Sequence, residues 1–173
     1  MTETIEQRVR RLEEIEAIRD LHRTYIFAID RRDWDTVGDL FTVDAELEIT
    51  GLDARSPTSG EVYRGRDSIV SDFYAPSVTA GPEAGHPHYS GHCATNLQIS
   101  LTGAAASASS YHLQITSDTQ ILAGTYQHRF RLTEAGWKIT FLQIDIRYHA
   151  RVVAEEVGGR PLADVRQAFA DHG

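Results

Sequence analysis

The sequence predicts an α+β domain in which one curled sheet wraps around helices from the N-terminal part of the chain. Near the N-terminus, apolar residues recur at spacings of three and four, whereas further on they alternate with polar residues between short turn-forming runs. Helical periodicity followed by hairpin periodicity is typical of this class. A single domain is therefore expected over residues 1–150, followed by a tail over residues 151–173.

Two helices are predicted first. One apolar stripe runs through Thr4–Asp30, with Glu, Arg and Asp on the other faces, which indicates a long amphipathic helix. The stripe consists of Ile15, Ile18, Leu21 or His22, Tyr25 or Ile26, and Ile29. Asp33 is placed to cap a shorter second helix over Trp34–Phe41.

Strands and turns dominate the rest of the chain. Ala45, Leu47 and Ile49 alternate with glutamates, which indicates a half-buried strand. The next predicted elements are a turn-rich segment Thr50–Gly60, a strand over Glu61–Arg64, a helix over Ser68–Tyr74 capped by Asp67, and a long loop over Ala75–Ser90. An antiparallel meander is then predicted over His92–Leu101, Ala105–Thr116, Gln120–Leu132 and Trp137–Tyr148, and a tail helix over Pro161–Ala170.

Composition and charge indicate a soluble globular protein. The chain has 173 residues, of which 41% are hydrophobic and 24% charged, and its net charge is −8. Because no basic stripe is present, nucleic acid is not an expected partner, and no apolar stretch reaches the roughly 18 to 20 residues of a membrane span. A single cysteine, Cys93, and an N-terminus without an apolar signal segment favour a reducing cytoplasm.

A carboxylate and a histidine are the first candidates for chemistry. Asp30 ends the first predicted helix, and His92 follows the long loop. A carboxylate that orients an imidazole produces a general base that works near neutral pH. The alternative is that Asp30 only bonds loop amides or pairs with Arg31 or Arg32. Tyr25 precedes Asp30 by five residues, about 140° around the helix, so the two share a cavity only if the helix end points into it.

Polar and apolar side chains alternate along the two strands that follow the loop. One face is predicted to carry Leu97, Ile99, Leu101, Tyr111, Leu113 and Ile115, and the other His92, Asn96, Gln98, His112, Gln114 and Thr116. The polar face either lines a sheltered pocket or lies open to solvent, and the pattern leaves both alternatives open. Cys93 points away from His92 in this scheme, and we expect it to be buried and inert.

Three histidines close together, His86, His88 and His92, invite comparison with a metal site. Pro87 interrupts the segment, however, and no recognised ligand spacing accompanies it. We therefore expect no metal, and we interpret His86 and His88 as loop residues near the mouth of a site. The sequence also lacks a Gly-rich phosphate loop, so no nucleotide or other cofactor is expected.

Several motifs resemble one known family. They are Ile18-Arg-Asp-Leu-His-Arg-Thr-Tyr25, Asp30-Arg-Arg-Asp-Trp34, His92 with Thr95-Asn96-Leu97, Gly124-Thr-Tyr126, and Gly136-Trp137-Lys138-Ile139. Together they resemble the SnoaL-like branch of the nuclear transport factor 2-like superfamily over about residues 8–148. Within that branch the chain looks closest to scytalone dehydratase, hexachlorocyclohexane dehydrochlorinase and bile acid 7α-dehydratase.

The resemblance implies a cone-shaped fold, with a curved antiparallel or mixed sheet around the N-terminal helices and a deep apolar pocket. By position, Asp30 and His92 match a catalytic aspartate and histidine, and Tyr25 matches a pocket tyrosine. The other implied site residues are His112 as a second catalytic group, and Asn96, Tyr126 and Arg147 as substrate-binding groups. A homotrimer or other homo-oligomer packed through the sheet is also implied.

These residues predict a cofactor-free lyase that removes water or another β leaving group from a small hydrophobic cyclic ketone, or a related isomerase or cyclase. His92 would abstract the α-proton, Asp30 would fix the imidazole tautomer, and Tyr25 would hydrogen-bond the carbonyl. The chain differs from scytalone dehydratase in having Ile29 before the aspartate, where that enzyme has a tyrosine.

Two alternatives remain. One is a structural β subunit of a ring-hydroxylating dioxygenase, although such subunits typically carry an arginine where this chain has Gly91. The other is a non-catalytic protein that binds small apolar ligands.

Overall fold

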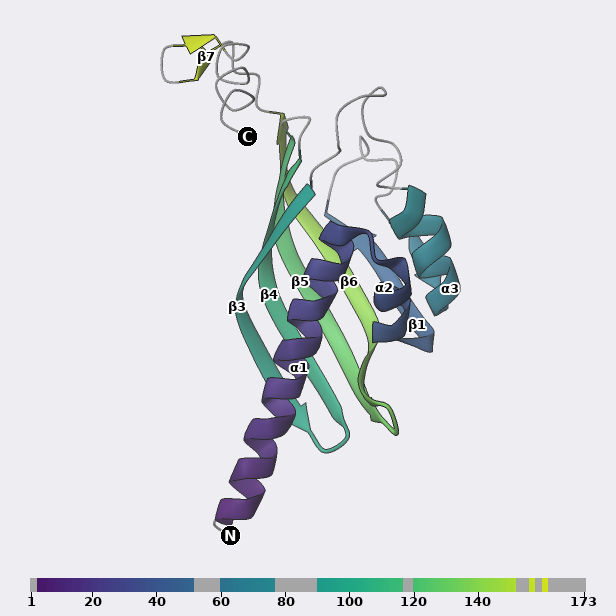
Figure 1. Cartoon of the computed structure of the whole chain (residues 1–173), viewed down its shortest axis with the longest axis vertical. Helices are drawn as coiled ribbons and strands as arrows, with labels where there is room; N and C mark the ends of the chain where they lie inside the picture. The colour runs from purple at the N-terminus through teal and green to yellow at the C-terminus, as the bar shows by residue number, and fades with distance from the viewer. Residues whose placement is uncertain are drawn as a thin grey trace.

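The computed structural model describes residues 3–51, 60–76, 90–116 and 120–151, together with 156–157 and 160–161. It contains a six-stranded sheet in the order β2-β1-β6-β5-β4-β3, with helices against one face (Figure 1). The helices are α1 (Ile5–Arg31), α2 (Trp34–Leu40), α3 (Arg66–Ser68) and the π-helix η1 (Ile69–Tyr74). The sheet strands are β1 (Phe41–Thr50), β2 (Val62–Arg64), β3 (Ser90–Thr102), β4 (Ala105–Thr116), β5 (Gln120–Thr133) and β6 (Gly136–Arg151). The predicted α+β class is confirmed.

The tail contributes only the short strands β7 (Glu156–Val157) and β8 (Arg160–Pro161) to the described structure. The helix expected over Pro161–Ala170 lies outside the described residues apart from Pro161, which belongs to β8. The turn segment 52–59 and most of the predicted loop, 77–89, also lie outside them.

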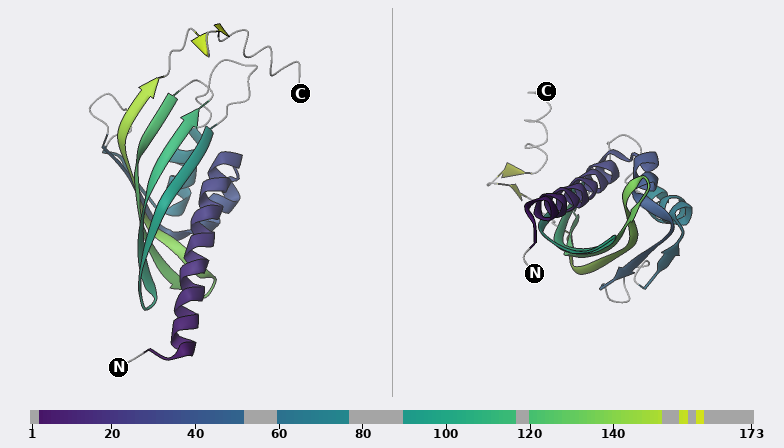
Figure 2. Two further views of the ribbon diagram at one scale, coloured as in Figure 1. Left: turned by 90° about the vertical axis from the view of Figure 1, so that its left-hand side faces the viewer. Right: turned by 90° about the horizontal axis from the view of Figure 1, so that it is seen from below.

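Helix α1 begins with a capping box in which Thr4 and Gln7 satisfy each other's backbone N–H groups. It ends at Arg32, whose left-handed backbone (φ 59°) lets its N–H reach the carbonyls of Ala28 and Ile29. The C-terminal half lies across the inner face of the curved sheet (Figure 2), and the N-terminal turns extend past the sheet (Figure 1). No helix within the described ranges is long and apolar enough to cross a membrane.

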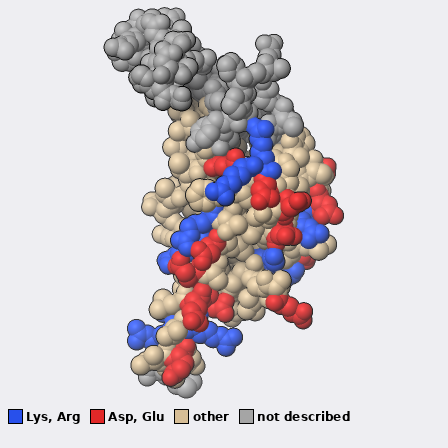
Figure 3. All heavy atoms as spheres, in the orientation of Figure 1, with Lys and Arg blue, Asp and Glu red and all other residues tan. Residues whose placement is uncertain are grey.

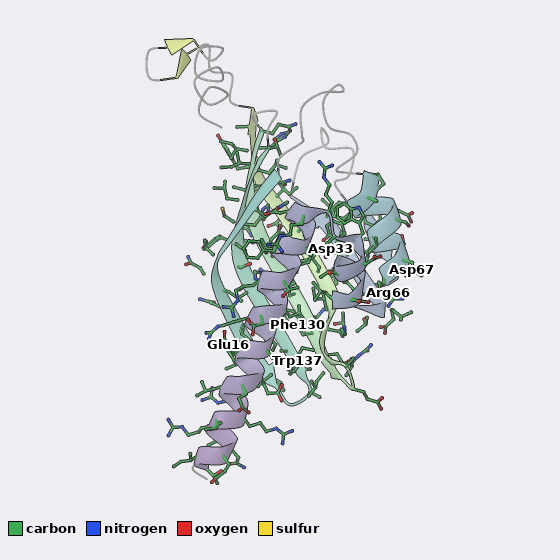
Figure 4. The ribbon with its side chains drawn as sticks, viewed as in Figure 1. Glu16, Asp33, Arg66, Asp67, Phe130 and Trp137 are labelled. Atoms are coloured by element: carbon green, nitrogen blue, oxygen red, sulfur yellow. The ribbon has the colours of Figure 1, made fainter. Side chains whose placement is uncertain are left out.

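The buried stripe of α1 packs on inward-facing residues of the strands. Its members are Ile18, Leu21, His22, Tyr25, Ile26, Ala28 and Ile29. Phe130 of β5 and Trp137 of β6, labelled in Figure 4, belong to the same core. The Trp137 indole donates to the Glu14 carboxylate. The outer side of α1 carries the Glu16, Arg19 and Arg23 ion pairs, and acidic and basic groups are intermixed over this face of the molecule (Figure 3).

The sheet is mixed because β1 pairs with β6 in parallel, whereas the other strand pairs are antiparallel. Asp33 caps α2 by accepting from the Thr36 N–H, as predicted, but the helix ends at Leu40. Phe41 already belongs to β1, so this strand begins directly after the helix.

The third helix differs from its prediction. Its N-cap is Gly65, with φ 86° and no side-chain capping bond, and Asp67 lies inside the helix rather than at its cap. A positive φ is readily adopted by glycine, so the chain turns at Gly65 without a side-chain cap. Ile69–Tyr74 then winds as a π-helix and buries Ile69 and Tyr74. Sequence periodicity does not distinguish this rare form from an α-helix.

A β-bulge at Asn96 overturns the predicted strand faces. Thr95 pairs with Tyr111 and Gln98 with Ser109, so two residues of β3 oppose one of β4. Asn96 adopts φ 57°, a left-handed conformation that asparagine tolerates better than most residues. His92 and Leu97 consequently face inward, whereas Asn96 is exposed, so the prediction that His92 and Asn96 share a face was wrong.

The bulge also separates the residues predicted to share the apolar face. Leu97, Ile99 and Leu101 pack against the core, whereas Tyr111, Leu113 and Ile115 of β4 are exposed on the outer face. Cys93 is exposed as well, which corrects the expectation that it is buried. It neighbours Leu113 in the ladder, on the side opposite His92.

Gly124 permits a close backbone approach between β5 and β6. A Cβ atom there would lie 1.9 Å from the Asp145 carbonyl oxygen, at a shift in the strand register. We expect Gly124→Ala to lower the free energy of unfolding by more than about 2 kcal/mol, because backbone atoms must move. Urea unfolding measures the difference.

Gly38→Ala in α2 is the matched control, because its Cβ would meet Val70 at an ordinary 3.7 Å. Replacing a helical glycine there should be neutral or stabilising by up to about 1 kcal/mol. Equal effects of the two substitutions would contradict the steric account of Gly124.

Candidate functional site

The structure brings Asp30 and His92 into direct contact across 62 positions of sequence. Asp30 lies in the last turn of α1, and His92 is the third residue of β3. The Nδ1 atom of His92 lies 2.6 Å from Oδ1 of Asp30, and the His92 backbone N–H donates to both carboxylate oxygens at 3.2 Å. Both side chains are largely buried, with 10% and 22% of the His92 and Asp30 side chains exposed.

This contact determines what the imidazole can do. An ionised carboxylate only accepts hydrogen bonds, so the bond to Asp30 requires a proton on Nδ1. In the neutral ring the other nitrogen, Nε2, then carries the lone pair and can accept a proton. Asp30 would also stabilise the imidazolium that forms when Nε2 is protonated. The pair therefore has the geometry of a general base.

The contact also explains how a carboxylate is accommodated at the C-terminal end of a helix. The helix dipole disfavours negative charge there. The backbone N–H and the imidazole of His92 together provide the compensating donors. The same contact joins the end of α1 to the start of β3.

Tyr25 lies in the interior, and its hydroxyl is 2.6 Å from that of Tyr74. Burial raises the pKa of both phenols well above the ordinary value, so both are protonated at neutral pH. Both hydroxyls can therefore donate hydrogen bonds but cannot serve as bases near pH 7.

Tyr126 and His112 line the inner face between Asp30 and the deeper core. Their rings stack at 4.5 Å between centroids. Burial is the main cause that raises the pKa of Tyr126, with smaller contributions from Tyr25 and Asp30. Burial, with a smaller contribution from His92, also lowers the pKa of His112 to about 4. Neither ring nitrogen of His112 has a hydrogen-bond partner among the described residues.

Three polar residues that sequence reasoning missed lie deeper in the same core. His22 of α1 approaches Ser110 of β4 at 3.4 Å, and its ring meets His128 of β5 edge to face at 5.1 Å. Burial lowers the pKa of His22 to about 4 and that of His128 well below its ordinary value. The alternation Tyr126, His128, Phe130 along β5 was the signal available in the sequence.

Asn96 and Arg147 lie apart from this group. They line a hollow of about 420 Å³ on the outer face of the sheet, together with Tyr111, Thr125 and Gln127. Arg147 pairs there with Asp145 at 2.6 Å. The predicted site residues therefore divide into two sets: Tyr25, Asp30, His92, His112 and Tyr126 lie on the inner side, and Asn96 and Arg147 lie on the outer side.

Within the described ranges, no group of three or more His, Cys, Asp or Glu side chains could hold a metal ion. His86 and His88, which prompted the comparison with a metal site, lie outside those ranges.

A curved mixed sheet that holds a helix on its inner face is also the fold of a nuclear transport factor 2-like protein with a cystatin-like fold from Novosphingobium aromaticivorans, which is 20% identical to this chain. The model of the SnoaL-like domain matches residues 10–143. The chain belongs to this family. No significant match was found among curated proteins.

Solved structures share the fold. A protein described as an aromatic ring hydroxylase from Novosphingobium aromaticivorans is 27% identical, with TM-score 0.64, over 82% of this chain and 94% of that chain. A protein described as a scytalone dehydratase from the same species is 19% identical, with TM-score 0.66, over 88% and 95%. Hexachlorocyclohexane dehydrochlorinase LinA-type3 from Novosphingobium barchaimii is 19% identical, with TM-score 0.64, over 83% and 93%.

The buried neutral histidines predict acid sensitivity. For His22, His112 and His128 the folded pKa is below the unfolded value of about 6.5. Between pH 6.5 and about 4 the unfolded chain therefore binds more protons, so the free energy of unfolding falls as the pH drops. We expect His128→Phe to flatten this slope by about one proton.

Urea unfolding at several pH values gives the slope. His149→Phe is the control, because that histidine is exposed on β6. A His128→Phe slope as steep as that of the unsubstituted protein would contradict the account.

Proposed function

We propose that the protein is a cofactor-independent lyase that removes water or another β leaving group from a hydrophobic cyclic ketone or a related alicyclic substrate. The observation that carries this proposal is the 2.6 Å contact between His92 Nδ1 and Asp30, which leaves Nε2 as the basic nitrogen. The family likeness to a dehydratase and a dehydrochlorinase supports an elimination.

The elimination would proceed through an enolate. His92 Nε2 takes the proton from the carbon next to the carbonyl, and the C–H electron pair moves into the enolate. The enolate then re-forms the carbonyl as the bond to the β leaving group breaks, and a double bond forms between the α and β carbons. A departing hydroxide receives a proton from the His92 imidazolium or through His112, and leaves as water.

The interior suits an uncharged substrate. Among residues 3–51, 60–76, 91–116 and 120–150 no lysine or arginine is buried, and His22, His112 and His128 are neutral at pH 7 because their pKa values are lowered. A negatively charged enolate would therefore be stabilised by neutral donors, for which Tyr25 and Tyr126 are the candidates. Hydrogen bonds of this kind are stronger in a dry site than in water.

A structural role is the second candidate. One similar structure is described as an aromatic ring hydroxylase and another, 16% identical, as the β subunit of an aromatic-ring-hydroxylating dioxygenase, which supports a β-subunit role. A third reading, a binder of small apolar ligands, would use the same interior without the proton transfer. Turnover separates the lyase from both, because neither a structural subunit nor a binder needs His92 as a base.

The outer face supports the homotrimer, or another homo-oligomer, that the family resemblance implies. Exposed apolar side chains there are Tyr111, Leu113, Ile115 and Tyr148. Leu113 lies in the same ladder row as Tyr148, through Ala123, so these residues are neighbours on the sheet. A contiguous exposed apolar area is typical of an interaction surface.

Asp30 and His92 are expected to act as one unit. Asp30→Asn, His92→Ala and the double variant should each lower turnover at least about a hundredfold, and the double variant no further than His92→Ala, because coupled catalytic groups are non-additive. A panel of cyclic β-hydroxy ketones, followed by mass spectrometry for the loss of one water, provides the assay.

Circular dichroism checks that the variants fold, and His149→Ala controls for the loss of a surface histidine. Unchanged turnover in His92→Ala would contradict the lyase proposal.

For the assembly, we expect light scattering of the unsubstituted protein to give a trimer at micromolar concentration. Leu113→Glu should give monomers, because charge in an apolar interface is unfavourable. Gln127→Glu, on the polar part of the same outer face, should leave the assembly intact. A monomer before substitution would rule out the trimer.

A further inference from the structure

Tyr74 comes from η1, which no sequence motif connects with the site, yet its side chain is directed into the interior. Only 4% of it is exposed, and Tyr25 is completely buried. The 2.6 Å separation of the two hydroxyls is a short hydrogen bond across 49 positions of sequence. The η1 segment lies beside α2, on the opposite side of that helix from most of the sheet (Figure 1).

The π-helical winding explains why Tyr74 faces inward. Ile69 and Tyr74 are the buried residues of η1 and are five positions apart. In an α-helix, residues five apart point about 140° away from each other. In a π-helix, bonds span five residues, so positions five apart lie on one face. Such turns are rare and frequent at functional sites, so the local backbone is consistent with a specific role for Tyr74.

Neighbouring rings restrain both phenols. Trp34 stacks on Tyr74 at 6.3 Å, and Phe73 meets it at 4.7 Å. Tyr25 makes edge-to-face contacts at 5.9 to 6.3 Å with Phe41, Tyr74, Tyr126 and His128. Packed rings of this kind hold their hydroxyl groups in place, because the rings cannot swing away without opening the core.

The pair of hydroxyls has one hydrogen left to donate to a third group. Two protonated phenols carry two O–H hydrogens, and their mutual bond uses one. When Tyr74 donates to Tyr25, the Tyr25 hydrogen is left for a third group. Accepting a hydrogen bond makes a hydroxyl a stronger donor, because successive bonds polarise one another. The Tyr25 ring lies 6.2 Å from that of Tyr126, which stacks on His112. His112 pairs in the ladder with Ala94, two residues from His92, so the tyrosine pair lies beside the His–Asp site.

We infer that Tyr74 is a positioning residue, which donates its hydroxyl hydrogen to Tyr25 and thereby directs the Tyr25 hydroxyl toward the oxygen of the substrate carbonyl. This inference rests on the proposed lyase function, in which that oxygen becomes negatively charged. Tyr74 itself does not touch the substrate. Its contribution is the orientation of the Tyr25 hydroxyl, which is the donor that does.

The test compares Tyr74→Phe, Tyr25→Phe and the double variant in the intact chain, with the cyclic β-hydroxy ketone that is turned over fastest. We expect Tyr74→Phe to lower kcat about five- to tenfold with KM nearly unchanged, the size of one hydrogen bond. The double variant should match Tyr25→Phe. Tyr63→Phe is the control, since that ring packs on Phe73 but its hydroxyl bonds Glu61 at the surface.

A readout independent of turnover is the ring-carbon NMR resonance of Tyr25 in protein labelled with ζ-¹³C tyrosine, assigned by its loss in Tyr25→Phe. It should shift in Tyr74→Phe and not in Tyr63→Phe. An unshifted resonance overturns the inference even if no substrate is found.

The kinetic outcomes separate the two ideas. Normal kcat in Tyr74→Phe beside a slow Tyr25→Phe overturns the inference and leaves the lyase proposal standing. Normal kcat in both variants removes Tyr25, and with it Tyr74, from the mechanism. If the fold-losses in kcat of the two single variants multiply in the double variant, Tyr74 acts independently of Tyr25. That outcome also contradicts the inference.

Discussion

The contact between Asp30 and His92 constrains both the fold and the site. One carboxylate accepts from the backbone and the side chain of the same residue, so the end of α1 and the start of β3 are held in a single geometry. The helix dipole makes that position unfavourable for an isolated carboxylate. The contact on which the proposed base depends is therefore also the one that stabilises the carboxylate at the helix end, so the proposed chemistry and the stability of the fold depend on the same atoms.

The interior behind this pair contains buried histidines and tyrosines, which are polar but uncharged. Its histidines are kept unprotonated by burial, its tyrosines keep their protons for the same reason, and Asp30 is the anion at its edge. A site of this kind would distinguish substrates by the positions of their hydrogen-bonding groups more than by their charge.

The features that could be predicted from the sequence are those with a local signal. Periodicity gave α1, the cap at Asp33 and the long hairpins, and the family resemblance pointed to Asp30, His92 and Tyr25. The parallel pairing of β1 with β6, the π-helical turn before Tyr74 and the bulge at Asn96 have no such signal, because each depends on tertiary contacts or on one extra residue. The bulge alone accounts for the misplacement of Asn96.

The bulge at Asn96 divides β3 into two segments, and the alternation of inward-facing and outward-facing residues is reversed between them. Before it, even-numbered residues such as His92 face the interior, and after it odd-numbered residues such as Leu97 do so. A relative that lacked one residue at Asn96 would have an unbroken β3–β4 ladder. Its histidine and the apolar end of its β3 would then face opposite sides of the sheet, so a gap in a sequence alignment at Asn96 has a structural consequence. Asn96 is thus the extra residue that lets the segment carrying His92 and the segment carrying Leu97 face the same side of the sheet.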